Sequence, residues 1–266
     1  MDDIEDIVNY DLALVNRELN KHLRHDNLVD EEIDNFINGP SKHVRSIIVL
    51  LYLYANDKKA DTSIIDLLAG CELIHSASLL HDDVVDEADK RRENTTLARK
   101  ISPYISILAG DYLVSLAVKK IMNLNNPDIL QKFTVCIEKM SRAEIRQYLQ
   151  RNEKISADSY LDICRDKTAG LFGTVLECAA LLSGLDTDKA KNLGMIYGTL
   201  FQIKNDMEPY SADNDRKNGV STAAEIFGIE KTTNLADNYK KEMREIIINF
   251  PNERYRNALV RFTDNL

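Results

Sequence analysis

The stretch IIDLLAGCELIHSASLLHDDVVD, from Ile64 to Asp86, carries the strongest structural signal in the sequence. Its apolar and small residues continue to His81 in a helical pattern without a break. The polar residues Asp61-Thr62-Ser63 stand directly before it, and side chains of this kind cap helix N-termini. The stretch therefore predicts one long helix whose final residues are carboxylates.

Helical spacing of apolar residues recurs on both sides of this stretch, and no region shows a series of strands separated by turns. Turn-forming residues punctuate the chain at 39–41, 125–127, 183–184 and 213–215. The further helices are predicted at residues 2–23, 33–37, 44–54, 107–122, 127–152, 156–182, 187–204 and 232–248. We expect an all-α protein, built as a helical bundle.

The composition favours a single domain over residues 1–266. The chain has 10 glycines and 5 prolines, and no linker-like or low-complexity segment marks a boundary. Its longest apolar run, Ile47 to Ala55, is too short to span a bilayer, and the acidic N-terminus is unlike a signal peptide. We therefore expect a cytoplasmic protein with no transmembrane segment.

Charge and cysteine usage exclude two further classes of protein. A formal net charge of -9 argues against nucleic acid as a partner, because phosphate backbones are bound by clustered basic surfaces. The four cysteines stand apart without any CxxC pair, which indicates neither a disulfide framework nor a zinc site.

The carboxylates at the end of the long helix predict a metal site. Asp82 and Asp86 stand four residues apart and share one helix face, on which His75 lies two turns earlier. Two carboxylates at that distance repel each other unless a cation lies between them. Magnesium suits such hard oxygen ligands and completes its shell with water and phosphate. The pattern predicts a magnesium diphosphate site at Asp82, Asp83 and Asp86.

A run of acidic residues such as 82–89 is also typical of a solvated helix end. Two features of the context favour a binding site over that interpretation. A long apolar helix delivers the carboxylates, and Arg91-Arg92 follows them directly. Adjacent acidic and basic groups are what a metal-bridged diphosphate requires.

A second basic cluster, Lys42-His43-Val44-Arg45, follows the break at Gly39-Pro40 and opens a buried helix. Helix N-termini and clustered Lys and Arg attract phosphate, although single residues of this kind are more often surface charges. Together with His75 and Arg92, the cluster predicts a second anion site.

From about Gly39 to Lys217 the sequence resembles the trans-type polyprenyl diphosphate synthases. The carboxylate motif, preceded by Glu72-Leu-Ile-His75 and followed by Arg91-Arg92, looks like the first aspartate-rich motif of that family. Three other segments also resemble the family, ILAGDYL at 107–113, KTAGLF at 167–172 and FQI at 201–203. The resemblance implies a bundle of the isoprenoid synthase type with a central active-site cavity.

The implied activity is condensation of isopentenyl diphosphate with an allylic prenyl diphosphate, using two or three magnesium ions bridged by diphosphate. The roles it implies follow the matching positions. Asp82, Asp83 and Asp86 would hold magnesium against the allylic diphosphate, and Arg91, Lys167 and Lys217 would contact its phosphates. Lys42, Arg45, His75 and Arg92 would bind isopentenyl diphosphate. Thr168 and Gln202 would line the reacting end, where the family stabilises the developing allylic cation.

The second aspartate-rich motif of the family is degenerate in this sequence. Asn205-Asp206-Met207-Glu208-Pro209 follows the FQI segment, so an amide replaces the leading aspartate and a proline the last. Asn205 and Asp206 are then the ligands left for a third magnesium ion. Smaller departures are Pro40-Ser41 for a double glycine, His43 for arginine and Glu93 for glycine.

These departures leave several interpretations open. The first is an active synthase with a weakened third metal site. The second is a catalytically reduced subunit that works with, or regulates, a paralogous active subunit. Asn205, Asp206 and Asp213 also resemble, loosely, the metal motif of class I terpene synthases, although a cyclase needs no isopentenyl diphosphate site. A structural bundle without catalytic activity is the fourth.

Residues one turn before the first aspartate form the floor of the product channel in this family. Here they are Ala77 and Ser78, with Ile74 a turn deeper, and the small side chains imply a product of geranylgeranyl length or longer. Close helix packing is the alternative reason for small residues at these positions. The resemblance also implies a homodimer, with the helix through residues 107–117 as its expected interface.

Overall fold

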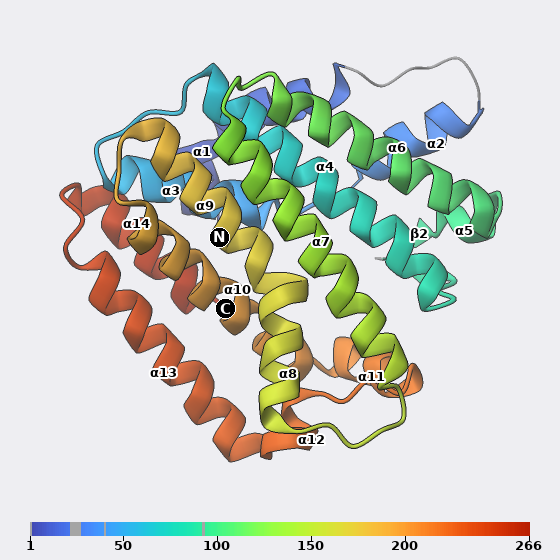
Figure 1. The fold of residues 1–266 in the computed structure, drawn as a ribbon. Helices are drawn as coiled ribbons and strands as arrows, with labels where there is room; N and C mark the ends of the chain where they lie inside the picture. Colours follow the sequence, from blue (N-terminus) through green and yellow to red (C-terminus); the bar gives the residue numbers. More distant parts are fainter. Residues whose placement is uncertain (1, 22–27, 40, 92–93) are drawn as a thin grey trace. The chain divides into compact units, whose positions relative to one another are not determined.

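The computed structural model describes residues 2–21, 28–39, 41–91 and 94–266, and the described chain is almost entirely helical (Figure 1). The predicted all-α class is confirmed. The chain divides into two compact units, one of residues 2–50 and 60–130 and the other of residues 51–59 and 131–266. The prediction of a single domain with a central cavity stays a prediction.

The first unit is built around the predicted long helix, α4. Its elements are α1 (Asp2–Asn20), α2 (Leu28–Ile37), the start of α3 (Val44–Ala55), α4 (Thr62–Val85), the two-residue strands β1 (Lys90–Arg91) and β2 (Asn94–Thr95), α5 (Leu97–Lys100), α6 (Pro103–Met122) and the start of α7 (Pro127–Leu149). The two strands pair antiparallel, Lys90 with Thr95 and Arg91 with Asn94.

Helix α4 begins where the sequence predicts, because the Asp61 carboxylate accepts a hydrogen bond of 3.0 Å from the Ile64 N–H. It packs along α6 and against α1. The Ser106 hydroxyl of α6 donates to the Leu80 carbonyl over 3.0 Å, which fixes the two helices side by side. Burial of apolar side chains on several faces of α4 provides most of its stability.

Helix α4 is also long and apolar enough to cross a bilayer, the one such helix among the described residues. Of its most apolar 18-residue window, 67% is buried inside the fold, and the core helix of a soluble protein passes the same test of length and composition. Length and hydropathy alone are weak evidence for a membrane span.

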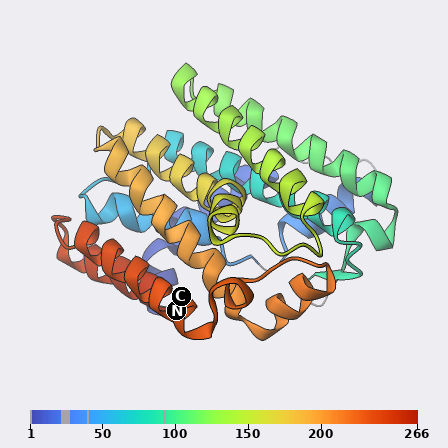
Figure 2. The ribbon, with the colours of Figure 1, turned by 60° about the horizontal axis from the view of Figure 1, so that its bottom comes forward.

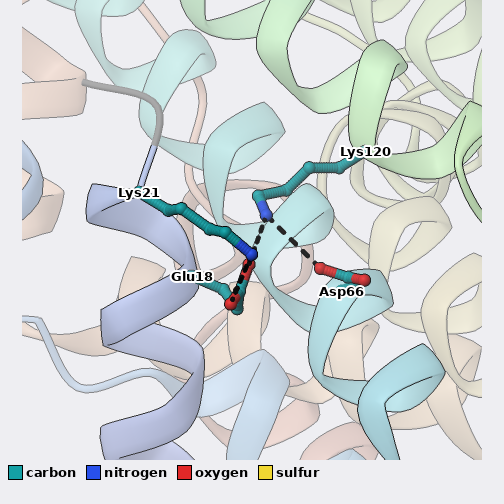
Figure 3. A network of polar contacts seen from close by, with 4 residues as sticks. All are labelled: Glu18, Lys21, Asp66 and Lys120. Atoms are coloured by element: carbon teal, nitrogen blue, oxygen red, sulfur yellow. Dashed lines mark hydrogen bonds and ion pairs between the residues drawn. The ribbon is translucent and has the colours of Figure 1, made fainter. Parts of the chain in front are cut away.

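A buried ion network holds α1 against α4 and α6 (Figure 3). Lys120, on α6, is buried, with 2% of its surface exposed. Its ammonium lies 3.1 Å from the Glu18 carboxylate on α1 and 3.4 Å from the Asp66 carboxylate on α4. Lys21 contacts Glu18 from the solvent side at 3.4 Å. Burial alone raises the pKa of Glu18, but Lys120 and Lys21 more than offset this, so its pKa lies below the usual value.

The second unit contains the end of α7, then α8 (Ala157–Cys164), a π-helical turn (Arg165–Ala169), α9 (Gly170–Ser183), α10 (Thr187–Met207), α11 (Pro209–Lys217), α12 (Ala223–Phe227), α13 (Ile229–Ile247) and α14 (Glu253–Asp264). Helices α9 and α10 run side by side along their length. The two C-terminal helices, α13 and α14, lie beside each other in red in Figure 2.

Two glycines allow the backbones of this unit to approach closely. A Cβ at Gly194 would lie 2.5 Å from the Phe172 carbonyl oxygen of α9, and one at Gly198 would lie 2.5 Å from the Ala169 Cα in the π turn. Atoms cannot overlap to that degree, so only glycine fits at either position. The spacing of one helical turn places both on the face of α10 that packs on α9.

Helices predicted at 44–54, 64–81, 107–122, 127–152, 187–204 and 232–248 are confirmed, with ends displaced by a few residues, as is usual for helix boundaries. The helical segment predicted at 156–182 is confirmed as a continuous run over 157–183, which contains a π turn at Arg165–Ala169. The turn predicted at 213–215 was wrong, because these residues lie inside α11. Pro209 at the first position of α11 is the helix-start signal that was missed.

Candidate active site

The carboxylates of the first unit lie at the C-terminal end of α4. Asp82 and Asp86 are half-buried and one helical turn apart, and the Asp86 N–H donates to the Asp82 carbonyl over 2.8 Å. Helical geometry places their side chains on one face, as predicted. Asp83 points differently, because it is buried, with 1% of its surface exposed.

Arg91 is the ion-pair partner of Asp83. Its Nε donates to Asp83 Oδ1 over 2.7 Å, so strand β1 brings a guanidinium back to the end of α4. Burial raises the pKa of Asp83, the Arg91 charge opposes that shift, and Asp86 adds to it, with a net pKa above the usual value. Asp83 thus positions Arg91 in this structure, and its predicted metal role stays a prediction.

A pocket of about 330 Å³ lies in the first unit, between the segment before α3, α4 and the β1–β2 hairpin. It is large enough for a small diphosphate ester. Two residues with predicted anion-binding roles, His75 and Arg91, line it. The wall further includes polar side chains of Ser41, His43, Glu72, Ser76, Asn94 and Thr95 and apolar ones of Leu19, Phe36, Ile37, Leu79 and Leu97.

Glu72 is the buried acidic group of this pocket, with 4% of its surface exposed. The Ser46 hydroxyl donates to its Oε1 over 2.7 Å, and Nδ1 of His43 lies 3.5 Å from its Oε2. Burial is the largest influence and raises the pKa of Glu72, but contacts with His43, His75 and Ser46 together lower it to about 2. Glu72 is therefore ionised beneath the basic groups of the pocket.

The residues of the basic cluster at 42–45 differ in their exposure to solvent. Lys42 is exposed, whereas Arg45 is 8% exposed and lies within the fold at the start of α3. His43 adopts a left-handed backbone with φ of 41°, and its Nδ1 lies 3.5 Å from Oε2 of Glu72. Arg92, also predicted to bind isopentenyl diphosphate, lies outside the described residues.

Four hydrogen bonds in the second unit connect Thr168 of the π turn with side chains and backbone of α8, α10 and α12. Thr168 Oγ1 donates to Gln202 Oε1 over 2.8 Å, and Gln202 Nε2 donates to Asp206 Oδ1 over 2.8 Å. The other oxygen of Asp206 accepts from the Tyr160 hydroxyl at 2.7 Å and the Ala223 N–H at 3.0 Å. Burial nevertheless keeps the pKa of Asp206 above its usual value.

Both oxygens of Asp206 are therefore engaged within the protein, and the residue is 3% exposed. Asn205, its neighbour, is half-buried. The third-metal role predicted for Asn205 and Asp206 stays a prediction. Through these hydrogen bonds Asp206 joins α8, α10 and α12.

The π turn places Lys167 and Thr168 on consecutive positions of a widened helical turn, a feature found often at functional sites. Lys167 Nζ donates to Gln147 Oε1 over 2.6 Å and is paired with the Glu144 carboxylate, both on α7. Lys217 is exposed at the last position of α11. The phosphate-binding roles of both lysines stay predictions.

The three residues predicted to control chain length lie on α4. Ile74 and Ala77 are buried, with 3% and 1% of their surfaces exposed. Ser78 is half-buried, and its hydroxyl donates to the His75 carbonyl over 2.8 Å.

Sequence reasoning missed the structural importance of Glu72 and Tyr160. Glu72 stands within the apolar stretch at 64–81, where an unpaired carboxylate would be costly, so its position signalled a buried partner. Tyr160 had no comparable signal, because its partner Asp206 is distant in the sequence.

The donor set at the end of α4 fits magnesium. No described group of three or more His, Cys, Asp or Glu side chains is gathered as a complete metal cage. Magnesium needs no such cage, because it binds proteins through one or two carboxylates and takes water and phosphate as its other ligands. Asp82 and Asp86 would supply those two carboxylates.

Residues 26–245 match the family described as Polyprenyl synthetase. The chain belongs to this family. It is 28% identical over 221 residues to octaprenyl diphosphate synthase of Escherichia coli, covering 81% of this chain and 68% of that protein. It is 31% identical over 254 residues to a prenyl transferase of Cyanidium caldarium, covering 90% and 79%.

Comparison of structures agrees with that of sequences. The chain resembles the solved geranyltranstransferase of Thermotoga maritima with a TM-score of 0.84 and 27% identity, over 97% of this chain and 96% of that one. The predicted polyprenyl synthase family and its helical fold are therefore confirmed.

Proposed function

We propose that the protein is a polyprenyl diphosphate synthase, which joins isopentenyl diphosphate to an allylic prenyl diphosphate and forms a long-chain product. One observation carries the proposal: a pair of carboxylates one turn apart on α4 adjoins a basic pocket in a chain of the polyprenyl synthetase family. Relatives named octaprenyl and decaprenyl diphosphate synthase support condensation to long chains.

Enzymes of this family depend on a divalent metal ion. Asp82 and Asp86 would hold magnesium against the allylic diphosphate, with Asp83 holding Arg91 in place beside them. Bound magnesium would supply positive charge that stabilises the departing diphosphate. Arg91 adds fixed positive charge at the same end of α4 and requires no reorganisation when the bond to diphosphate breaks.

The pocket beside α4 is proposed to bind isopentenyl diphosphate. Its polar wall contains His75 and Arg91, and the exposed Lys42 stands at the start of the basic cluster. His43 stands at the position where an arginine is usual in the family, and its Nδ1 lies 3.5 Å from Oε2 of Glu72.

Thr168 and Gln202 are proposed to act at the reacting carbon atoms, as their positions in the family motifs imply. The oxygens of Thr168 and Gln202 would stabilise the allylic cation that forms when diphosphate leaves. The double bond of isopentenyl diphosphate then attacks this cation, and loss of a proton to the released diphosphate completes one elongation. No side-chain nucleophile is required.

The test is incubation of the purified protein with magnesium, labelled isopentenyl diphosphate and dimethylallyl, geranyl, farnesyl or geranylgeranyl diphosphate in separate reactions. Extended products are expected, and Asp82→Ala should abolish them. Glu138→Ala, which removes an exposed carboxylate of α7, is the matched control and should retain them. Absence of product with every primer would contradict a synthase that acts alone.

Product length is proposed to be geranylgeranyl or longer, because Ala77 and Ser78 leave the side of α4 before Asp82 without a bulky group. Ser78→Phe should shift the product to fewer isoprene units by filling that space. An unchanged product distribution would show that other residues limit the chain.

We propose a homodimer, supported by the apolar side chains that α6 exposes. Tyr104 is 78% exposed, Leu108 62% and Ile107 41%, and a contiguous apolar surface of this kind is typical of an interface. Sedimentation equilibrium should give twice the chain mass, and Leu108→Glu should shift the measured mass toward that of the monomer.

A cytoplasmic location is also proposed.

A further inference from the structure

Asp206 stands in the degenerate second motif, yet its contacts are those of a group that sets the direction of other hydrogen bonds. Three donors converge on its carboxylate: Gln202 Nε2 on Oδ1, and the Tyr160 hydroxyl and Ala223 N–H on Oδ2. The Ala223 N–H can only donate, so the Asp206 carboxylate acts as the acceptor toward these groups.

This fixes the orientation of the Gln202 side chain. A carboxylate requires a donor opposite it, so the amide nitrogen of Gln202 must face Asp206. The amide oxygen is then left to face Thr168, 2.8 Å away. The reversed amide would place two acceptors against each other at the Asp206 end.

The orientation of Gln202 in turn fixes that of Thr168. Because the amide oxygen can only accept, the Thr168 hydroxyl must donate its proton to Gln202. Its remaining lone pairs are then directed away from the hydrogen-bond chain. A hydroxyl that presents lone pairs stabilises a neighbouring cation, whereas one that presents its proton opposes it.

We propose that Asp206 is a positioning residue that directs the hydrogen bonds of Gln202 and Thr168, so that Thr168 presents lone pairs to the cationic reaction centre. The inference rests on the proposed synthase function and goes beyond it in the role of Asp206. It explains why an aspartate is retained at this position although its neighbours in the motif are altered.

Asp206→Asn is expected to reverse the direction of these hydrogen bonds while keeping the shape of the side chain at position 206. In this variant the asparagine oxygen takes the two donors at the Oδ2 position, so its NH2 group faces Gln202. Gln202 must then turn its oxygen toward position 206 and its NH2 toward Thr168, whose proton is displaced toward the substrate. We expect kcat to fall by about 10²-fold, the scale of one misplaced polar group at a charged transition state.

Two further variants distinguish a role of Asp206 in directing hydrogen bonds from a role in supporting the fold. Tyr160→Phe removes a donor but leaves Asp206 an acceptor, so kcat should change less than ~3-fold. Thr168→Val removes the hydroxyl, and it should reduce kcat strongly in the wild type but little in Asp206→Asn. Tyr255→Phe is the control, since this ring of the same unit packs on Tyr54 and takes no part in the chain of hydrogen bonds.

Each variant is compared for kcat, KM for isopentenyl diphosphate, the magnesium concentration for half activation and Tm. The inference predicts a lower kcat for Asp206→Asn with KM and half-activating magnesium unchanged. A tenfold rise in half-activating magnesium with full kcat at saturation would instead identify a metal ligand and overturn it. The inference would also be overturned if the kcat losses of Asp206→Asn and Thr168→Val multiplied in the double variant. A lower Tm of Asp206→Asn with unchanged kcat would overturn it as well.

The wild-type reaction separates failure of this inference from failure of the proposed function. If the wild type is active and a variant gives one of the contradicting results, only the role proposed for Asp206 is disproved. An inactive wild type removes the synthase function and with it the inference.

Discussion

The carboxylate of Glu72, on α4, is buried with its Oε2 atom 3.5 Å from Nδ1 of His43, which lies in the segment before α3. Ser46 donates a hydrogen bond to the other oxygen of Glu72. A buried carboxylate with these partners couples the start of α3 to the centre of α4, and it makes the first unit sensitive to acid.

The sign of this sensitivity follows from the pKa of Glu72, which is about 2 in the fold against 4.5 for an ordinary glutamate. A depressed pKa stabilises the fold above pH 4.5, and this contribution is lost as the pH falls toward 2. It is on the order of 3 kcal/mol. Urea unfolding from pH 6 to pH 2 should therefore show a shallower loss of stability for Glu72→Gln than for wild type. Glu138→Gln, at an exposed carboxylate, should follow the wild-type curve.

Lys120 is predicted to be a main support of α1. Lys120→Met leaves Glu18 and Asp66 without the ammonium they share, and loss of one partner of a buried ion pair costs about 3 kcal/mol. Lys119→Met, at the exposed neighbouring position, should cost less than about 0.5 kcal/mol. Thermal and urea unfolding of both variants measure the difference, and equal losses would contradict a structural role for Lys120.

Asn205→Asp should strengthen the proposed third metal site. The substitution returns an anionic oxygen to the leading position of the second motif, and a charged ligand binds magnesium more tightly than an amide does. We expect the magnesium concentration for half activation to fall several-fold. Asn214→Asp adds the same charge at an exposed position of α11 and should leave it unchanged. Equal shifts in both variants would indicate a general charge effect.

Gly198→Ala is expected to disturb the π turn. The added methyl group would lie 2.5 Å from the Ala169 Cα and 2.9 Å from the Phe172 ring, so α10 must move away from the turn that carries Thr168. Overpacking of this kind costs about 1 to 3 kcal/mol. At Gly170 a new Cβ would come no closer than 3.3 Å to the Arg165 oxygen, so Gly170→Ala should cost less. Urea unfolding should rank the two variants in that order.

Much of the fold could be read from the sequence because it is encoded locally. The period of apolar residues, the polar cap at Asp61 and the turn residues each act within a few positions of the chain, so α4 and most other long helices were predicted correctly. The π turn could not be predicted, since its residues continue the helical pattern. Its close approach to α10 is visible only through the tertiary contact at Gly198.

The sequence by itself determined the family, because its motifs are recognised from residue order alone. It also determined that Asp82 and Asp86 share one helix face, because they stand one turn apart in the chain. Only the tertiary structure decided that Asp83 is buried against Arg91, that Glu72 lies under His43 and that Asp206 accepts from Gln202 and Tyr160. Sequence spacing cannot give such pairings. They form when packing removes a polar group from water and the fold must supply a partner for it.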